Sequence, residues 1–252
     1  MQDRDDLSIL DAEDELESPL DSIEPVEEES ETPPPDPELM LELLVHPEAP
    51  QRMLAARAFC ELTDARAIPK LIDLLADVCP LVRVSAAYAL GRNTSAEVVE
   101  PLIEILNNDW NGYVRKGVVW ALGNSSDRRC LKPLIHALKT DISAVRLWAA
   151  SSLAQIAKLE YEDVLAAIPP LIEGLRRDEI AAVRSNCAWS LGQLCRELPS
   201  NVVYATAIDA LIEALVEDED VGVKEDAKSA ILRLGDPRGL QTIEELELEG
   251  LI

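Results

Sequence analysis

The sequence predicts an all-α protein, an αα-solenoid (superhelix) of about six helix pairs over residues 37–252, preceded by a disordered acidic tail over residues 1–36. Three observations support this prediction. A string of the form Val-Arg-…-Ala-Leu-Gly recurs along the chain, a Leu-Ile-Asp/Glu string precedes most copies, and the first 36 residues have a different composition from the rest. Repetition at a period of about 30–40 residues is typical of solenoids.

The tail contains many Asp and Glu residues, one Arg and no Lys, and ends in a run of prolines. Such a segment buries too little apolar surface to offset the entropy lost on ordering, so we expect disorder. Two roles remain open. The tail acts as a solubilising segment, or it docks on a basic partner or into the protein's own groove through five apolar anchors, Leu7, Ile9, Leu10, Leu16 and Leu20.

The repeat period follows from the Val-Arg strings. Their basic residues lie 32, 31, 38 and 40 residues apart, at Arg83, Arg115, Arg146, Arg184 and Lys224. The two longer steps predict insertions at 158–163 and 197–204, after the Arg-bearing segments. A weaker copy begins at Arg52, and it gives a degraded first pair over residues 37–63.

Both segments of each repeat are predicted helices. The Leu-Ile segments show the i, i+3, i+4 apolar spacing of a helix, and the Val-Arg segments have an Ala- and Gly-rich side that allows close approach of neighbouring helices. We expect oxygen-bearing caps before the first helices at Asp64, Ser95, Asp127 and Asp236. We expect prolines in their first turns at Pro101, Pro133 and Pro170. A closing helix should follow Asp236.

These strings resemble HEAT repeats, and more narrowly the HEAT-like repeats named after phycobilisome lyases. Asp64-Ala65-Arg66-Ala67-Ile68-Pro69 with Leu71-Ile72, and Gly235-Asp236-Pro237-Arg238, match the first half of that motif, and the Val-Arg strings match the second. The layout, an acidic tail before about six repeats with Trp in second helices, is similar to that of the cyanobacterial HEAT-repeat proteins that bind the iron–sulfur scaffold protein IscA. The resemblance implies a protein-binding role and, alternatively, a phycobilisome-associated one.

One Asp and one Arg recur in every repeat. Asp77, Asp109 and Asp178 precede their Arg by six positions, as in the HEAT ladder that joins neighbouring repeats by charge-assisted hydrogen bonds. We therefore predict a structural role for these arginines. Trp110, which aligns with Val78 and Ile142, is interpreted as packing in a turn.

The candidate site is a set of aromatic and polar side chains on the second helices. At positions two, five and nine after the repeat Arg, the residue type varies between repeats, and positions three or four apart share a helical face. The resemblance places second helices on the concave side, which would form a groove. The predicted partner-binding residues are Tyr88, Arg92, Lys116, Trp120, Asn124, Trp148, Gln155, Asn186, Trp189 and Gln193. The alternative is that the rings fill gaps between helices.

The five cysteines lack a C-x-x-C pair, so we expect no cofactor and no metal site held by this chain alone. Cys60, Cys130 and Cys187 align with small residues and are predicted to be buried. Cys79 and Cys195 are the better candidates for exposure and, if the iron–sulfur resemblance applies, for contact with a cluster.

Other function classes fit poorly. With two histidines and no G-x-S-x-G, phosphate-binding loop or Cys–His constellation, we expect no catalytic residues. A net charge of −25 and the lack of a basic run oppose nucleic-acid binding. We expect no membrane insertion and, from the absence of a signal peptide, a cytoplasmic protein. The sequence thus predicts a non-enzymatic scaffold or adaptor that holds a partner protein, with IscA as the suspected partner, and a phycobilisome assembly factor or bilin lyase-type subunit as the alternative.

Overall fold

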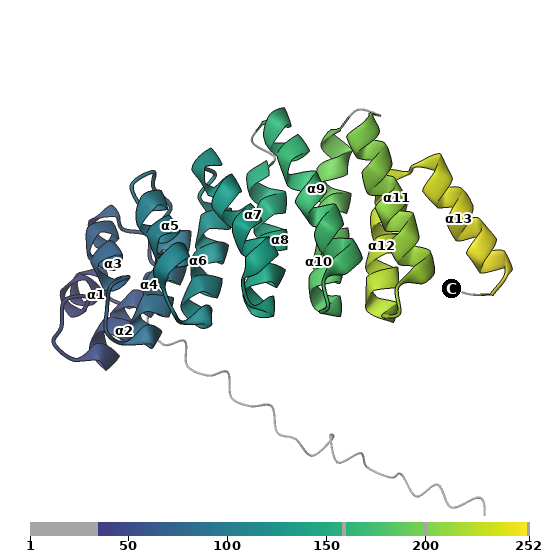
Figure 1. Ribbon diagram of the computed structural model, residues 1–252. Helices are drawn as coiled ribbons and strands as arrows, with labels where there is room; N and C mark the ends of the chain where they lie inside the picture. Colours follow the sequence, from purple (N-terminus) through teal and green to yellow (C-terminus); the bar gives the residue numbers. More distant parts are fainter. Residues whose placement is uncertain (1–34, 158–159, 199–200, 251–252) are drawn as a thin grey trace, which may run out of the picture. The chain divides into compact units, whose positions relative to one another are not determined.

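The computed structural model describes residues 35–157, 160–198 and 201–250, and the chain divides at Pro35/Asp36 into two units. The described part is all-α, as predicted (Figure 1). The predicted acidic tail lies outside the described residues, except for its last two positions. The α-helices are α1 (Pro37–Leu43), α2 (Ala49–Ala58), α3 (Ile68–Leu74), α4 (Pro80–Arg92), α5 (Val99–Asn108), α6 (Gly112–Asn124), α7 (Leu131–Thr140), α8 (Ser143–Ile156), α9 (Tyr161–Arg177), α10 (Ala181–Leu194), α11 (Val202–Glu217), α12 (Val221–Leu234) and α13 (Pro237–Leu248).

Within Asp36–Ile252 the helices form six consecutive pairs, α1/α2 to α11/α12, followed by the closing helix α13 (Figure 1). The second helices α2, α4, α6, α8, α10 and α12 contact one another in this order, and the first helices α7, α9, α11 and α13 do the same. Two layers result, with a continuous apolar core along the stack. No pair could bury its apolar side alone, which is the reason repeats of this kind occur in arrays.

Small residues set the spacing of the second-helix layer, as predicted. A Cβ atom added to Gly91 of α4 would lie 2.8 Å from the Cα of Ala121 in α6, and one added to Gly123 would lie 2.8 Å from the Cβ of Ser152 in α8. Between the same helices, Ser152 donates a hydrogen bond to the carbonyl oxygen of Val119 at 3.1 Å. The helices therefore approach one another more closely than larger side chains would permit.

The predicted Asp–Arg ladder is confirmed. Arg83 binds Asp109 through two nitrogens, at 2.7 and 3.0 Å, and its third nitrogen donates to the carbonyl oxygen of Asp77 at 2.9 Å. Each arginine thus joins the turn of its own repeat to the turn of the next. The same pairing recurs as Arg52–Asp77, Arg115–Asp141, Arg146–Asp178 and Arg184–Asp218.

The D-x-R motif at the start of the first helices also has a defined role. As expected, Asp64, Asp127 and Asp236 are N-cap residues, and the side chain of each accepts a hydrogen bond from the backbone N–H two residues later. The arginine of each motif then pairs with a carboxylate of the preceding first helix. These pairs are Arg66–Glu38, Arg129–Glu100 and Arg238–Asp209.

The two insertions lie where they were predicted, and they lengthen the first helices that follow them. The described part of the first insertion begins α9 at Tyr161, and the second leads into α11 at Val202, so both first helices are extended at their N-terminal ends. Pro170 consequently lies inside α9 rather than in its first turn, where Pro101 and Pro133 do lie in α5 and α7. The extension is fixed by Asp163, which is buried and binds Arg128 of the preceding repeat at 2.7 Å.

The ladder makes stability depend on pH. Burial raises the pKa of Asp109, but the hydrogen bonds from Arg83 and from the N–H of Asn111, with the charge of Arg83, outweigh it and hold this pKa below its ordinary value. The pKa values of Asp77, Asp178 and Asp218 are lowered similarly. A lowered folded-state pKa stabilises the protein above the unfolded value of about 3.9, and this contribution is lost as pH falls through the folded pKa.

We therefore expect the melting temperature to be level between pH 7 and 5 and to drop below about pH 4. Thermal unfolding followed by circular dichroism at pH 7, 5, 4 and 3 measures this. The drop should be smaller in Asp109→Asn, which removes one titrating group. A melting temperature that rises steadily to pH 3 would show that relief of acidic repulsion outweighs the ladder.

Candidate functional site

The ten predicted partner-binding residues all lie on second helices, on α4, α6, α8 and α10. None of them is buried, and we call this set the second-helix face. Trp189 is the most open of its aromatic residues, with 37% of its surface exposed. The four helices contact one another in series, so the four aromatic side chains follow one another across the layer.

Two of these rings touch. The centroids of Tyr88 and Trp120 lie 5.2 Å apart with the ring planes tilted by 51°. The guanidinium carbon of Arg92 lies 5.6 Å from the centroid of Trp120, within range of a cation–π interaction. Tyr88, Trp120 and Arg92 therefore form one cluster across α4 and α6.

Glycines on the facing helices make room for both rings. A Cβ atom on Gly91 would lie 2.6 Å from Cζ3 of Trp120, and one on Gly117 would lie 3.4 Å from Cε2 of Tyr88. The rings thus pack partly between helices and partly towards solvent. Both interpretations of these residues, gap filling and surface presentation, describe part of the arrangement.

The face continues onto α8 and α10. The ammonium nitrogen of Lys116 lies 5.5 Å from the centroid of Trp148, again within cation–π range. The hydroxyl of Ser151 in α8 donates to the side-chain oxygen of Asn186 in α10 at 3.1 Å. Each second helix is therefore joined to its neighbour by at least one contact between face residues or residues beside them.

The structure contradicts the prediction that Trp110 packs in a turn. It does not pack in the turn between α5 and α6, because 77% of its surface is exposed. Its ring instead lies near Arg83 of the ladder, with 5.9 Å between the guanidinium carbon and the ring centroid. Val78, at the same place one repeat earlier, is also exposed.

The structure also contradicts two of the predictions made for the cysteines, those for Cys195 and Cys60. Cys195 is buried, contrary to expectation, and burial raises the pKa of its thiol to about 12. Cys130 and Cys187 are buried as predicted, while Cys60 and Cys79 are partly exposed. Burial also raises the pKa of Cys60. Cys79 thus stays the better placed of the two candidates for exposure.

Asn93 is a buried polar residue whose role the sequence did not indicate. The side-chain amide of Asn93, after α4, donates to the carbonyl oxygens of Phe59 at 2.7 Å and Ala89 at 3.0 Å, and its oxygen accepts from the N–H of Asp64 at 3.2 Å. It ties the end of α2 to the start of the next repeat. The alignment of the repeats did not indicate this role, because the next two repeats have Ser125 and Ile156 at the position of Asn93.

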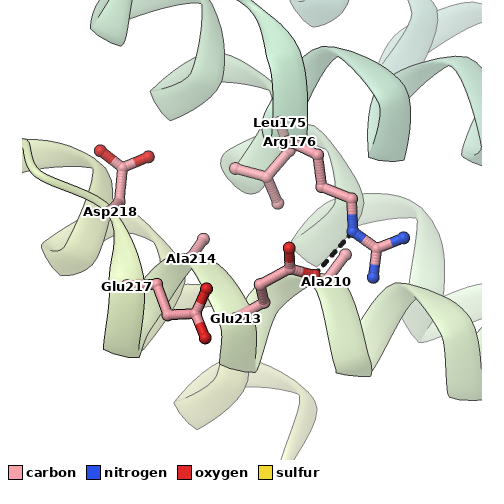
Figure 2. A pocket seen from close by; sticks show the side chains of 7 residues that line it. All are labelled: Leu175, Arg176, Ala210, Glu213, Ala214, Glu217 and Asp218. Atoms are coloured by element: carbon pink, nitrogen blue, oxygen red, sulfur yellow. Dashed lines mark hydrogen bonds and ion pairs between the residues drawn. The ribbon is translucent and has the colours of Figure 1, made fainter.

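Two of the pockets in the structure lie between first helices, away from the second-helix face. One of about 190 Å³ is bounded by α9 and α11 and contains Arg176, Glu213, Glu217 and Asp218 (Figure 2). Arg176 donates to Glu213 at 2.8 Å, and Asp218 belongs to the ladder through Arg184. A similar pocket lies between α7 and α9 beside Asp178. Their recurrence at one place in the repeat indicates that they arise from helix stacking.

Within the ranges that the structure describes, no three His, Cys, Asp or Glu side chains are grouped as metal ligands. In the same ranges, no helix combines the length and the apolar character needed to cross a membrane.

A protein-family model described as HEAT repeats matches the chain over residues 37–122, 99–192 and 168–249. No curated protein matches it. Among solved structures, an engineered protein is 26% identical, with a TM-score of 0.60, over 79% of this chain and 98% of the other. A designed armadillo repeat protein in complex with the peptide (KR)4 is 20% identical, with a TM-score of 0.61, over 79% of this chain and 98% of the other. A computationally designed armadillo repeat protein for modular peptide recognition is 20% identical, with a TM-score of 0.56, over 78% and 98%.

Proposed function

Because the chain belongs to the HEAT-repeat family, we propose that it is a non-enzymatic scaffold that binds a partner protein through the second-helix face and stabilises or positions it. The observation that carries the proposal is the series of partly exposed aromatic side chains on four successive second helices. A solenoid can serve many functions, so the fold alone would not support this conclusion.

The chemistry of the face suits protein recognition. Tryptophan and tyrosine are enriched at binding hot spots, where truncation costs about 2 kcal/mol or more. Here Trp120 is already held by Tyr88, Arg92 and the space above Gly91, and Trp148 lies against Lys116. Side chains that are ordered before binding lose little entropy on association, which favours affinity.

Of the designed armadillo repeat proteins of similar fold, one is in complex with a peptide and another was designed for modular peptide recognition. This supports a polypeptide as the ligand. The iron–sulfur scaffold protein IscA, suggested by the resemblance in layout, stays a prediction for the partner's identity. The alternative prediction is a phycobilisome component, with the chain as an assembly factor or bilin lyase-type subunit.

Site-specific photo-crosslinking in cells tests the proposal. A photoreactive residue at Gln155, on the second-helix face, should capture a protein that the same residue at Glu104 of α5 does not capture. Both positions are exposed, so a difference in capture reports which layer of helices, first or second, contacts the partner. Cross-linking from Glu104 alone would assign binding to the first-helix layer and contradict the proposal.

The captured partner then allows a quantitative test. The double variant Trp120→Ala/Trp189→Ala should lower affinity for it by at least tenfold, because two hot-spot rings are lost. Trp110→Ala removes a ring outside the face and should leave affinity within twofold. Circular dichroism must show the same helicity in all three proteins. Unchanged affinity in the double variant would move the binding site off the second-helix face.

A further inference from the structure

From α2 to α10, the second-helix layer differs in charge from the rest of this acidic chain, whereas α12 carries Glu225 and Asp226. The protein has 48 Asp and Glu residues among 252, yet α2, α4, α6, α8 and α10 contain none. First helices do carry them; α11, for example, has Asp209, Glu213 and Glu217. The ladder carboxylates lie in the turns that precede the second helices, where arginines bind them.

Three cations at the α2–α6 end of this layer are available to a ligand. Arg57, Arg92 and Lys116 lie on consecutive second helices, at least partly exposed, and within the described ranges none forms an ion pair. Arg57 occupies the repeat position that holds Tyr88 and Trp120 in the next two repeats. The charges therefore border the aromatic cluster at the α2–α6 end of the layer.

We propose that this part of the layer binds an extended acidic segment of a partner protein, with acidic side chains on the three cations and apolar side chains on the rings. The inference rests on the proposed function and specifies its partner. Charge complementarity selects the segment, because a basic peptide would meet three cations, and the rings of Trp120 and Trp148 already lie against Arg92 and Lys116.

The cations stand at different places along their helices: Arg57, Arg92 and Lys116 follow their repeat arginines by five, nine and one positions. With about 8–10 Å between packed helices and a rise of about 1.5 Å per residue along each helix, consecutive cations lie more than one helix spacing apart. Because an extended chain advances about 3.3 Å per residue, acidic residues about three to five positions apart in the bound segment match them. The amides of Asn124, Gln155 and Gln193, at one repeat position on α6, α8 and α10, can pair with the peptide backbone farther along.

Nucleic acid fits less well. Phosphate binding depends on neutralising many charges, and the α2–α6 end of this layer offers three cations that form no ion pair among the described residues, on a protein of net charge −25. Base stacking needs open ring faces, and cations already cover one face of Trp120 and one of Trp148.

Fluorescence anisotropy with labelled twelve-residue probes tests the proposal on the full chain. The acidic peptide (Glu-Leu-Ser)4 should bind at least tenfold more tightly than (Lys-Leu-Ser)4. The double variant Arg92→Glu/Lys116→Glu should weaken acidic-peptide binding at least tenfold. The matched control Lys132→Glu/Arg177→Glu changes the net charge equally, on exposed positions of α7 and α9, and should stay within twofold.

Several results would overturn the inference. Equal binding of the two peptides, no binding of the acidic one, or equal losses in both double variants would each do so. A twelve-nucleotide single strand is a further probe. If it binds the unmodified protein and not Arg92→Glu/Lys116→Glu, and the acidic peptide does not bind, the inference is also overturned. If the photo-crosslinked partner contacts the face through a non-acidic segment, the proposed binding function stands and only this inference fails.

Discussion

Replacing Asp109 by alanine is expected to lower the free energy of unfolding by about 3–5 kcal/mol, the cost of leaving one buried charge without its partner. Asp109 and Arg83 have side chains only 4% and 9% exposed, and they form two hydrogen bonds. The same carboxylate accepts the N–H of Asn111 at 2.8 Å. The substitution therefore leaves a buried guanidinium without its counter-ion and an N–H without its acceptor.

Urea unfolding followed by far-ultraviolet circular dichroism measures this loss. Each repeat contacts mainly its neighbours, so amide hydrogen exchange should also become faster in α1–α4, on the N-terminal side of the broken connection. Glu100→Ala is the control. It removes an exposed, solvent-screened pair with Arg129 and should lower the free energy of unfolding far less than Asp109→Ala does. Equal losses in the two variants would show that the ladder is worth no more than a surface ion pair.

The periodic features of the fold could be predicted because the repeat supplies its own alignment. The spacing of Arg83, Arg115 and Arg146 placed the ladder, and the small residues at Gly91 and Gly123 marked where second helices approach each other. In both cases one position has the same role in successive repeats. The residues of the candidate site were predicted from the same alignment, at repeat positions where the residue type varies.

Features that depend on one repeat's neighbours could not be predicted. The alignment placed Trp120 on the exposed side, but its contact with Tyr88 depends on the missing side chain at Gly91. Trp110 is exposed, and its ring lies beside Arg83 of the ladder, a contact that its alignment with Val78 and Ile142 does not indicate. Cys195 is buried because the chain continues into another short helical turn after α10, at the start of the second insertion.

Gly91→Ala is the second substitution with a large expected effect, and it connects stability to the candidate site. Alanine normally stabilises a helix by about 1 kcal/mol relative to glycine. Here the new methyl group would lie 2.8 Å from the Cα of Ala121 and 2.6 Å from the ring of Trp120. Because the first of these neighbours is backbone, α4 and α6 must move apart, and we expect a net loss of about 2 kcal/mol, within the usual cost of overpacking.

The same change should displace Trp120 from Arg92 and Tyr88. We therefore expect tryptophan fluorescence to shift to longer wavelength in the folded state and affinity for the captured partner to fall with stability. Gly222→Ala is the matched control, since its methyl group would meet only the side chain of Asp220, at 3.1 Å, near the start of α12. It should be neutral or slightly stabilising. If Gly91→Ala were also stabilising, the distance between α4 and α6 would not be set by the glycine, and the ordering of the aromatic cluster would need another cause.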